Sequence, residues 1–288
     1  MLRTSKISFP GFGIDEFEIN SVAFKIGNIE IAWYALIITI GMIAAVAHII
    51  FRAKQSGLKP EDTLDFIIWA IPIGVIGARL YYVLAEIENF HSFKEVINIR
   101  SGGLAIYGGI IAGAITVFVV SKVKKIPFLA FADYCTPGIL FAQAIGRWGN
   151  FANGEAFGSE TTWFCRMGLN NVLTEFKTLY VHPTFLYESL WNLAGFILAN
   201  VFYKKRQYDG QVFLFIFGWY GFGRMFIEGL RTDSLYGSFF GIQFRLSQVL
   251  AALIFATCLF FIIYFATIKK TKKELYYHTN IKNSEKRK

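Results

Sequence analysis

The chain has 288 residues, of which 55% are hydrophobic and 17% are charged, and its mean hydropathy is +0.45. Soluble globular domains carry about 25% charged residues. The 31 Phe, 14 Tyr and 6 Trp are more aromatic side chains than one soluble core of this size would bury. This composition excludes a disordered tail, a coiled coil, a collagen-like fibre and a small disulfide scaffold, and it indicates a polytopic membrane protein.

Seven stretches of the sequence are apolar over roughly the 20 residues that a transmembrane helix needs. They lie near 31–51, 64–84, 102–121, 126–145, 184–203, 210–228 and 244–268. The sequence therefore predicts an all-α polytopic membrane protein, with seven transmembrane helices in a membrane domain over 31–268. Residues 1–30 lack a basic segment followed by an apolar one, so we expect an extracytoplasmic segment there and not a cleavable signal peptide.

Lysine and arginine are distributed unevenly between the loops, and cytoplasmic loops are the ones that accumulate them. One set of segments holds 17 Lys and Arg in 42 residues: 52–63, 122–125, 204–209 and the tail 269–288. The other set holds 9 in 101 residues: 1–30, 84–101, 146–183 and 229–243. The N-terminus is therefore predicted outside and the C-terminus in the cytoplasm, with small extracytoplasmic elements, one of them in the outer loop 146–183.

The net charge of +9 follows from this bias and from the basic tail 269–288, so no nucleic-acid partner is expected. The tail is most simply a topology signal, and attachment to anionic lipid head groups is the alternative. The three cysteines, Cys135, Cys165 and Cys258, have no CxxC or Cys/His ligand spacing. The glycine-rich stretches also lack the lysine of a phosphate-binding loop. No metal or nucleotide site is evident, so we expect neither a metal nor a cofactor.

Several ionisable side chains lie inside the predicted spans, although a charge in hydrocarbon costs at least about 2.5–3.5 kcal/mol. In the predicted topology most of them share one depth, toward the outer ends of their helices. These are Arg79, Arg147, Glu188, Arg224 and Glu228, with Tyr34 and Tyr107 at a similar depth and Asp133 deeper. Three arginines against two carboxylates leave positive charge for a phosphate, whose oxygens match the guanidinium fork. Interhelical ion pairs with snorkelling side chains are the alternative.

Two spacings predict helix contacts. Tyr220, Arg224 and Glu228 are spaced i, i+4 and i+8, so they share one helix face on which Arg224 and Glu228 can pair, and Arg231 follows. Gly109 and Gly113 form a GxxxG pair, which is typical of close helix packing in membranes.

The segment 146–158, GRWGNFANGEAFG, resembles the signature G-R-x-G-N-F-x-N-x-E-x-x-G of the prolipoprotein diacylglyceryl transferase family. Four further segments resemble blocks of the same family in the same order: AWYA at 32–35, GARLYYV at 77–83, HPTFLYES at 182–189 and YGFGRMFIEGLRTD at 220–233. The likeness covers about residues 20 to 268, and the predicted seven spans agree with it.

The resemblance implies a reaction in which the sn-1,2-diacylglyceryl group of phosphatidylglycerol moves to a thiol. The acceptor would be the lipobox cysteine of a preprolipoprotein, presented by its signal peptide at the lipid bilayer. The product would be a thioether, and glycerol 1-phosphate would leave. The resemblance also implies a bacterial plasma or inner membrane, with the active site toward the outer leaflet.

The site residues follow from matching these blocks. The resemblance and the chemistry together imply catalytic roles for Arg147, Arg224, Tyr107 and Glu155. Substrate-binding roles are expected for Tyr34, Arg79, Asn150, Asn153, Gly158, Glu188, Tyr220, Glu228 and Arg231. Arg147 and Arg224 are expected to hold the leaving phosphate, and the nearby positive charge would favour the attacking thiolate. Glu155 and Glu188 are expected to orient the arginines or the glycerol hydroxyls, and Glu228 to position Arg224.

One residue departs from the family pattern. Many relatives have a histidine before the double glycine of the third helix, where this chain has Tyr107. A phenol is a poor proton acceptor at neutral pH, so the proton acceptor stays unassigned, and His182 is interpreted first as a structural residue. An anion transporter and an intramembrane protease are the other classes considered. A continuous polar path and a second aspartate beside Asp133 are not evident in the sequence, so both are less favoured.

Overall fold

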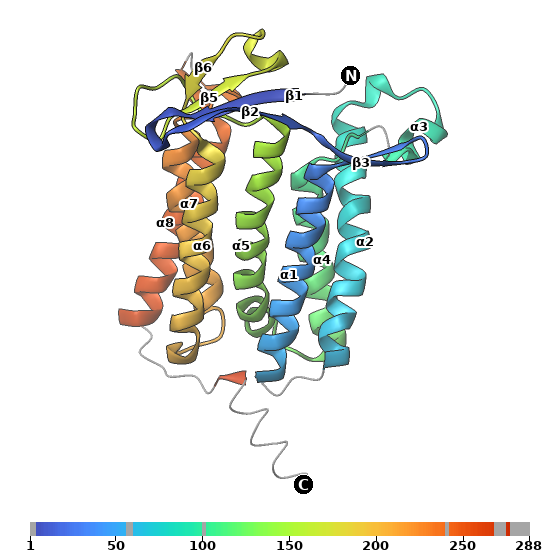
Figure 1. Ribbon diagram of the computed structural model, residues 1–288. Helices are drawn as coiled ribbons and strands as arrows, with labels where there is room; N and C mark the ends of the chain where they lie inside the picture. The colour runs from blue at the N-terminus through green and yellow to red at the C-terminus, as the bar shows by residue number, and fades with distance from the viewer. Residues whose placement is uncertain (1–3, 56–59, 100–101, 240–241, 268–274, 277–288) are drawn as a thin grey trace. The chain divides into compact units, whose positions relative to one another are not determined.

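Figure 1 shows the computed structural model of the chain, which describes residues 4–55, 60–99, 102–239, 242–267 and 275–276. The described residues belong to two compact units. One lies within Met1–Ala47 and Cys135–Lys273, and the other within His48–Tyr134 and Glu274–Lys288. Except for Leu275 and Tyr276, the predicted basic tail 269–288 lies outside the described residues.

Each of the seven predicted spans coincides with a long helix. These helices are α1 (Trp33–Gln55), α2 (Pro60–Ala85), α4 (Ile106–Lys124), α5 (Phe128–Asn153), α6 (Thr184–Phe202), α7 (Gln211–Glu228) and α8 (Leu246–Thr267). In the described part of the chain, six of them, all except α7, are long and apolar enough to cross a membrane. The chain is therefore a polytopic integral membrane protein.

Short elements accompany these helices. They are the helix α3 (Phe93–Ile97) and the 3₁₀ turns Pro10–Phe12, Ile87–Asn89, Val172–Thr174 and Tyr203–Lys205. The structure also contains β-strands, which the prediction of an all-α fold did not include. These are β1 (Thr4–Phe9), β2 (Ile14–Asn20), β3 (Val22–Ile26), β4 (Ile29–Ala32), β5 (Met167–Asn170), β6 (Leu179–Val181), β7 (Tyr236–Phe239) and β8 (Ile242–Arg245).

The largest sheet joins the N-terminal segment to the loop before α6. Its four antiparallel strands have the order β2-β1-β5-β6, and Ile7 of β1 lies opposite Phe17 and Leu169. One face buries an apolar core made of Ile7, Met167, Leu169, Val181 and Phe185, with Phe151, Phe157 and Leu186 packed against it. Because Phe151 belongs to α5 and Phe185 to α6, this core fixes the sheet on the ends of those two helices (Figure 1).

α5 continues to Asn153, past the end of the predicted span at residue 145. Hydropathy falls there because Arg147, Asn150 and Asn153 are polar, but the backbone stays helical until Gly154. Gly154 has a φ of 61°. Its N–H donates to the Phe151 carbonyl (3.0 Å), and the Glu155 N–H donates to the Asn150 carbonyl (3.1 Å). These two bonds form the Schellman motif that ends helices at a left-handed glycine.

Two tryptophans fasten α6 to α7. Their rings stack with centroids 4.2 Å apart, and each indole N–H donates to the backbone carbonyl of the other tryptophan at 2.9 Å (Trp191 and Trp219). Each ring occupies the space beside a glycine of the opposite helix. A Cβ on Gly195 would lie 2.4 Å from Trp219, and one on Gly223 would lie 2.1 Å from Trp191. The two glycines therefore permit the close approach of α6 and α7.

In the other unit, α2 and α4 pack backbone to backbone. A Cβ on Gly77 would lie 2.2 Å from the Ala112 Cβ, and one on Gly108 would lie 2.3 Å from the Gly77 carbonyl oxygen. The predicted GxxxG pair is only partly right. Gly109 lies at ordinary contact distance from α2, whereas Gly113 faces open space. The tight contact falls one residue earlier in the chain because the surface facing α2 carries Gly108 and Ala112, spaced four residues apart.

Candidate active site

Glu188 is the centre of a polar network at one end of α5, α6 and α7. Its side chain is 3% exposed and contacts three guanidiniums. Arg147 of α5 pairs with Oε2, while Arg224 of α7 and Arg231 reach Oε1 at 2.8 and 3.4 Å. Charge pairing of this kind compensates a buried carboxylate for its lost hydration. One glutamate thus fixes the positions of three arginines from different segments.

The predicted pairing along α7 is present. Arg224 also forms an ion pair with Glu228 one turn later, and Glu228 is 2% exposed. Arg224 is therefore held between two buried carboxylates, one on its own helix and one on α6. Tyr220, one turn before Arg224 on the same helix, is partly buried.

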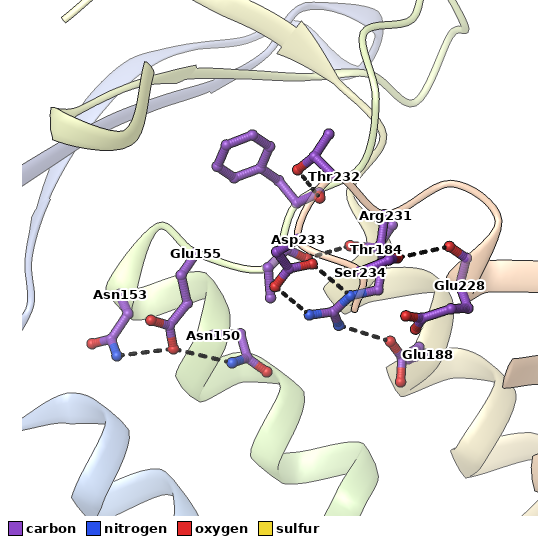
Figure 2. A network of polar contacts seen from close by, with 12 residues as sticks. Asn150, Asn153, Glu155, Thr184, Glu188, Glu228, Arg231, Thr232, Asp233 and Ser234 are labelled. Atoms are coloured by element: carbon purple, nitrogen blue, oxygen red, sulfur yellow. Dashed lines mark hydrogen bonds and ion pairs between the residues drawn. The ribbon is translucent and has the colours of Figure 1, made fainter. Parts of the chain in front are cut away.

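Arg231 lies just beyond the end of α7 and bridges two acids. Its guanidinium binds Asp233 through two bonds, from Nε to Oδ1 at 2.9 Å and from Nη2 to Oδ2 at 2.7 Å, in addition to its contact with Glu188. Figure 2 shows the Arg231 guanidinium between Asp233 and Glu188. Partial burial tends to raise the pKa of Asp233, but the bond and charge of Arg231 outweigh it, so this pKa is lowered.

The end of α5 carries an amide-rich part of the network. Arg147 donates to Asn150 Oδ1 (3.3 Å), and the amides of Asn150 and Asn153 both donate to Glu155 Oε1, at 3.1 and 3.2 Å. The Schellman turn at Gly154 explains this spacing because it reverses the chain and places Glu155 beside the last helical turn. A Cβ on Gly154 would lie 2.2 Å from Ser5 Oγ, so β1 also requires a glycine there.

The charges of the network differ from the expectation. The sequence suggested three arginines against two carboxylates at one depth. The contacts instead join Arg147, Arg224 and Arg231 to Glu188, Glu228 and Asp233, with Glu155 linked through Asn150. Among the described side chains joined by these contacts, three guanidiniums therefore meet four carboxylates, so this group of residues carries no excess of positive charge. The arginines are held in fixed positions, and N–H groups remain for a ligand because each guanidinium has five.

Two predicted residues of the same unit have packing contacts near the network. A Cβ on Gly149 would lie 2.9 Å from the ring of Tyr34, so Tyr34 of α1 packs against the signature helix α5. Gly158 donates its N–H to the His182 carbonyl (3.0 Å) and forms a β-bridge with Arg231. A Cβ there would lie 2.7 Å from the His182 Cβ. Gly158 therefore allows three backbone segments to meet beside the network.

Arg79 and Tyr107 belong to the other unit. Arg79 is 7% exposed and donates to four backbone carbonyls, those of Glu95, Val96, Gly102 and Gly103, at 2.7–2.8 Å. These bonds use most of its guanidinium donors, so Arg79 holds the segment before α4 in place. Tyr107 is the second residue of α4 and is 39% exposed.

Two charged residues of the site region were not singled out from the sequence. Asp233 binds Arg231, as described, and its position two residues after Arg231 was the available signal. Arg245 donates to the backbone carbonyls of Gly229 and Arg231, and it therefore supports the turn that follows α7. No local pattern marks Arg245, because β8 brings it back to that turn from a later segment.

His182 lies among polar and aromatic side chains outside the Glu188 network. Its Nδ1 lies 3.2 Å from the Tyr187 hydroxyl, which also lies 3.1 Å from the Cys165 thiol, and its ring packs on Trp163. Burial lowers the pKa of His182. These contacts involve no member of the Glu188 network.

Comparisons with known proteins agree with the sequence signature. A family model described as prolipoprotein diacylglyceryl transferase matches residues 21–264, a range that includes all five resembling segments. A Clostridium perfringens protein named phosphatidylglycerol–prolipoprotein diacylglyceryl transferase 1 is 46% identical over 228 residues, which cover 76% of this chain and 85% of the relative. Two proteins named phosphatidylglycerol–prolipoprotein diacylglyceryl transferase are each 42% identical to this chain, one from Listeria welshimeri over 254 residues and one from Enterococcus faecalis over 257 residues. Each alignment covers 85% of this chain and 90% of the relative.

The family resemblance is thereby confirmed over most of the chain. The matched range contains every member of the Glu188 network, from Arg147 to Asp233. The chain belongs to the prolipoprotein diacylglyceryl transferase family.

Proposed function

We propose that this chain transfers the sn-1,2-diacylglyceryl group of phosphatidylglycerol to the lipobox cysteine of prolipoproteins. The thioether product and glycerol 1-phosphate follow from that transfer. Family membership supports the reaction, since the relatives are named for this donor and this acceptor. One observation supports a location for the active site. Three segments that match the family, 146–158, 182–189 and 220–233, contribute residues to a single network around Glu188.

The network supplies what the departure of a phosphate requires. As the glyceryl C–O bond breaks, negative charge grows on the phosphate oxygens, and donors fixed beforehand stabilise that charge best. Arg147 and Arg224 are our candidates for these donors, because Glu188 fixes both and each retains N–H groups beyond its protein contacts. Their positive charge also favours the thiolate form of the incoming cysteine.

The remaining residues are assigned supporting roles. Asn150 and Asn153 carry amides that suit the ester or glycerol oxygens of the lipid. Tyr34, which packs against α5, and Tyr220, on the same helix as Arg224, carry hydroxyls. Glu188, Glu228 and Arg231 position the two phosphate-binding arginines. Gly158 acts through close backbone packing.

The roles proposed for Arg79 and Tyr107 rest on their contacts and positions within the second unit. Arg79 acts indirectly, by holding the segment that leads into α4. Tyr107 is assigned substrate positioning at the start of that helix.

We further propose that all seven long helices span the membrane, including α7, which packs against both α6 and α8. The Lys and Arg bias supports an outside N-terminus and a cytoplasmic C-terminus in a bacterial plasma or inner membrane. The network then lies toward the outer leaflet, where phosphatidylglycerol and the signal peptide of a preprolipoprotein are both accessible. In this topology residues 1–30, the loop between α5 and α6, and the segments 84–101 and 229–243 are extracytoplasmic.

The test uses purified protein in detergent with phosphatidylglycerol and a synthetic lipobox peptide. Mass spectrometry is expected to detect a diacylglyceryl adduct on the peptide cysteine together with released glycerol phosphate. Folded protein that yields neither product with phosphatidylglycerol would overturn the proposed transferase function.

A further inference from the structure

The four carboxylates of the network differ in their partners. Glu188 contacts three guanidiniums, Glu228 contacts Arg224, and Asp233 binds Arg231 through both oxygens. Glu155 is different, because within the described residues its carboxylate forms hydrogen bonds only with the amides of Asn150 and Asn153 and no ion pair. A carboxylate that is ion-paired with arginine is stabilised in its charged form and is a weak proton acceptor. Glu155 has no such pairing.

The geometry leaves half of the Glu155 carboxylate available. Both amides donate to Oε1, so the second oxygen, Oε2, has no donor among the described residues. An ionised carboxylate has about four acceptor positions, and Glu155 is only partly buried. Figure 2 shows the Glu155 carboxylate turned toward the two asparagines, apart from the Arg231 group. The amide bonds fix the carboxylate while one oxygen stays open.

Glu155 is also close to the proposed phosphate-binding group. Asn150 accepts a bond from Arg147 at 3.3 Å and donates one to Glu155 at 3.1 Å, so a single side chain links the arginine to the carboxylate. A thiol that attacks the carbon next to the bound phosphate must release its proton near that phosphate. Glu155 lies one side chain away from Arg147 and has an oxygen without a donor among the described residues, as a proton acceptor for this step needs.

We propose that Glu155 is the proton acceptor for the lipobox thiol, an inference that rests on the proposed transferase function. The S–H proton passes to Oε2 of Glu155, and the sulfur electron pair forms the C–S bond to the sn-3 carbon of the glyceryl group. The C–O bond to phosphate breaks, and its electron pair stays on the phosphate oxygen. The proton then passes from Glu155 to the departing glycerol phosphate or to water, which restores the carboxylate.

The test compares two lipobox peptides that differ in one atom, one with cysteine and one with selenocysteine. A selenol is already ionised at neutral pH, so its attack needs no proton acceptor. Glu155→Gln keeps an oxygen that accepts both amide bonds but cannot act as a base. The measured quantity is the ratio of turnover on the selenocysteine peptide to turnover on the cysteine peptide, for wild-type protein and for the variant.

With the cysteine peptide, Glu155→Gln is expected to lower kcat by about 10²–10⁴-fold with little change in KM, as for loss of a general base. With the selenocysteine peptide, the variant is expected to come within about tenfold of wild type, so its ratio rises well above the wild-type ratio. Arg224→Lys is the control, because Arg224 pairs with Glu188 and Glu228 and not with the asparagines that hold Glu155. Weaker phosphate binding in this variant lowers turnover on both peptides and leaves the ratio unchanged.

The ratio also separates chemistry from misfolding, since a damaged protein loses activity toward both peptides alike. An unchanged ratio in Glu155→Gln, with wild-type protein active, would overturn the assignment of Glu155 and leave the transferase function standing. Wild-type protein that modifies neither peptide would overturn the transferase function and the assignment with it.

Discussion

Glu188 is buried, and its single carboxylate forms ion pairs with three arginines at once. Arg147, Arg224 and Arg231 are 22%, 15% and 11% exposed, so water screens their mutual repulsion only weakly. The stability of this end of the protein and the positions of the catalytic candidates therefore depend on the same carboxylate.

Glu188→Gln is expected to destabilise the protein by about 3–5 kcal/mol, since it leaves buried guanidiniums without their shared counter-charge. Thermal unfolding in detergent measures the effect. The matched control is Glu18→Gln, whose side chain is 64% exposed, and it is expected to change stability by no more than about 0.5 kcal/mol. Similar unfolding midpoints for the two variants would contradict this prediction. They would mean that other groups balance the charge of the three arginines when Glu188 is lost.

The pair of Asp233 and Arg231 is expected to make stability depend on acid pH. Because the folded-state pKa of Asp233 is lowered, its contribution is full above the unfolded value of about 3.9 and is lost as pH falls through the folded value. The unfolding midpoint of Asp233→Asn should therefore lie below that of wild type at pH 7, and the two should converge under acid conditions. A difference that stays constant from pH 7 to the acid limit would rule out the ion pair as its source.

Site residues that belong to a sequence motif could be predicted individually. Site residues that only the fold brings together were harder to predict. The signature named Arg147, Asn150, Asn153 and Glu155, and the structure joins these four in one chain of contacts. The charge balance was missed because only charges on the predicted helices were counted, whereas Asp233 lies in the turn after α7, two residues after Arg231. A count of the charged residues at one depth of the predicted helices does not include acidic residues of the loops, even when the fold places them beside the site.

At the scale of elements, hydropathy located every long helix but not their polar ends. The end of α5 shows why, since polar residues terminate the apolar stretch while Gly154 terminates the helix. The sheet was not predictable either, because β1 pairs with β5 across more than half of the chain. Local alternation of side chains does not specify a partner strand so distant in sequence.

The contact between α6 and α7 gives a test of helix packing. Gly223→Ala places a Cβ 2.1 Å from the Trp191 indole, so the stacked tryptophans must separate or shift. Overpacking of this kind costs about 1–3 kcal/mol, and it also moves Arg224 relative to Glu188. We expect a lower unfolding midpoint and reduced transfer activity.

Gly113→Ala is the matched control for this change, because a Cβ at Gly113 has no neighbour within 4 Å. The same substitution there is expected to leave stability unchanged or to raise it by up to about 1 kcal/mol, through the better helix propensity of alanine. Equal effects of the two substitutions would mean that the tryptophan contact does not limit the approach of α6 and α7.

At the scale of the whole molecule, the distribution of Lys and Arg makes a prediction about orientation. The test introduces single cysteines into a chain whose own cysteines are replaced. Lys177→Cys places one in a predicted outer loop, and Lys205→Cys places one after α6 on the predicted cytoplasmic side. A membrane-impermeant maleimide should label the first in intact cells and the second only after permeabilisation. The opposite pattern would invert the proposed topology and place the network toward the inner leaflet.

The central claim is that the network around Glu188 is the site of diacylglyceryl transfer. The most direct measurement is the transfer rate of Arg147→Ala and Arg224→Ala. Arg166→Ala is the control, because among the described residues the guanidinium of Arg166 bonds the carbonyls of Thr162 and Trp163 and lies over the ring of Tyr180, away from the network. Both network variants are expected to lose at least about 100-fold in rate while staying inserted and folded, since each removes charge from the phosphate site. Arg166→Ala should stay near the wild-type rate. Near-wild-type transfer by both network variants would contradict the claim.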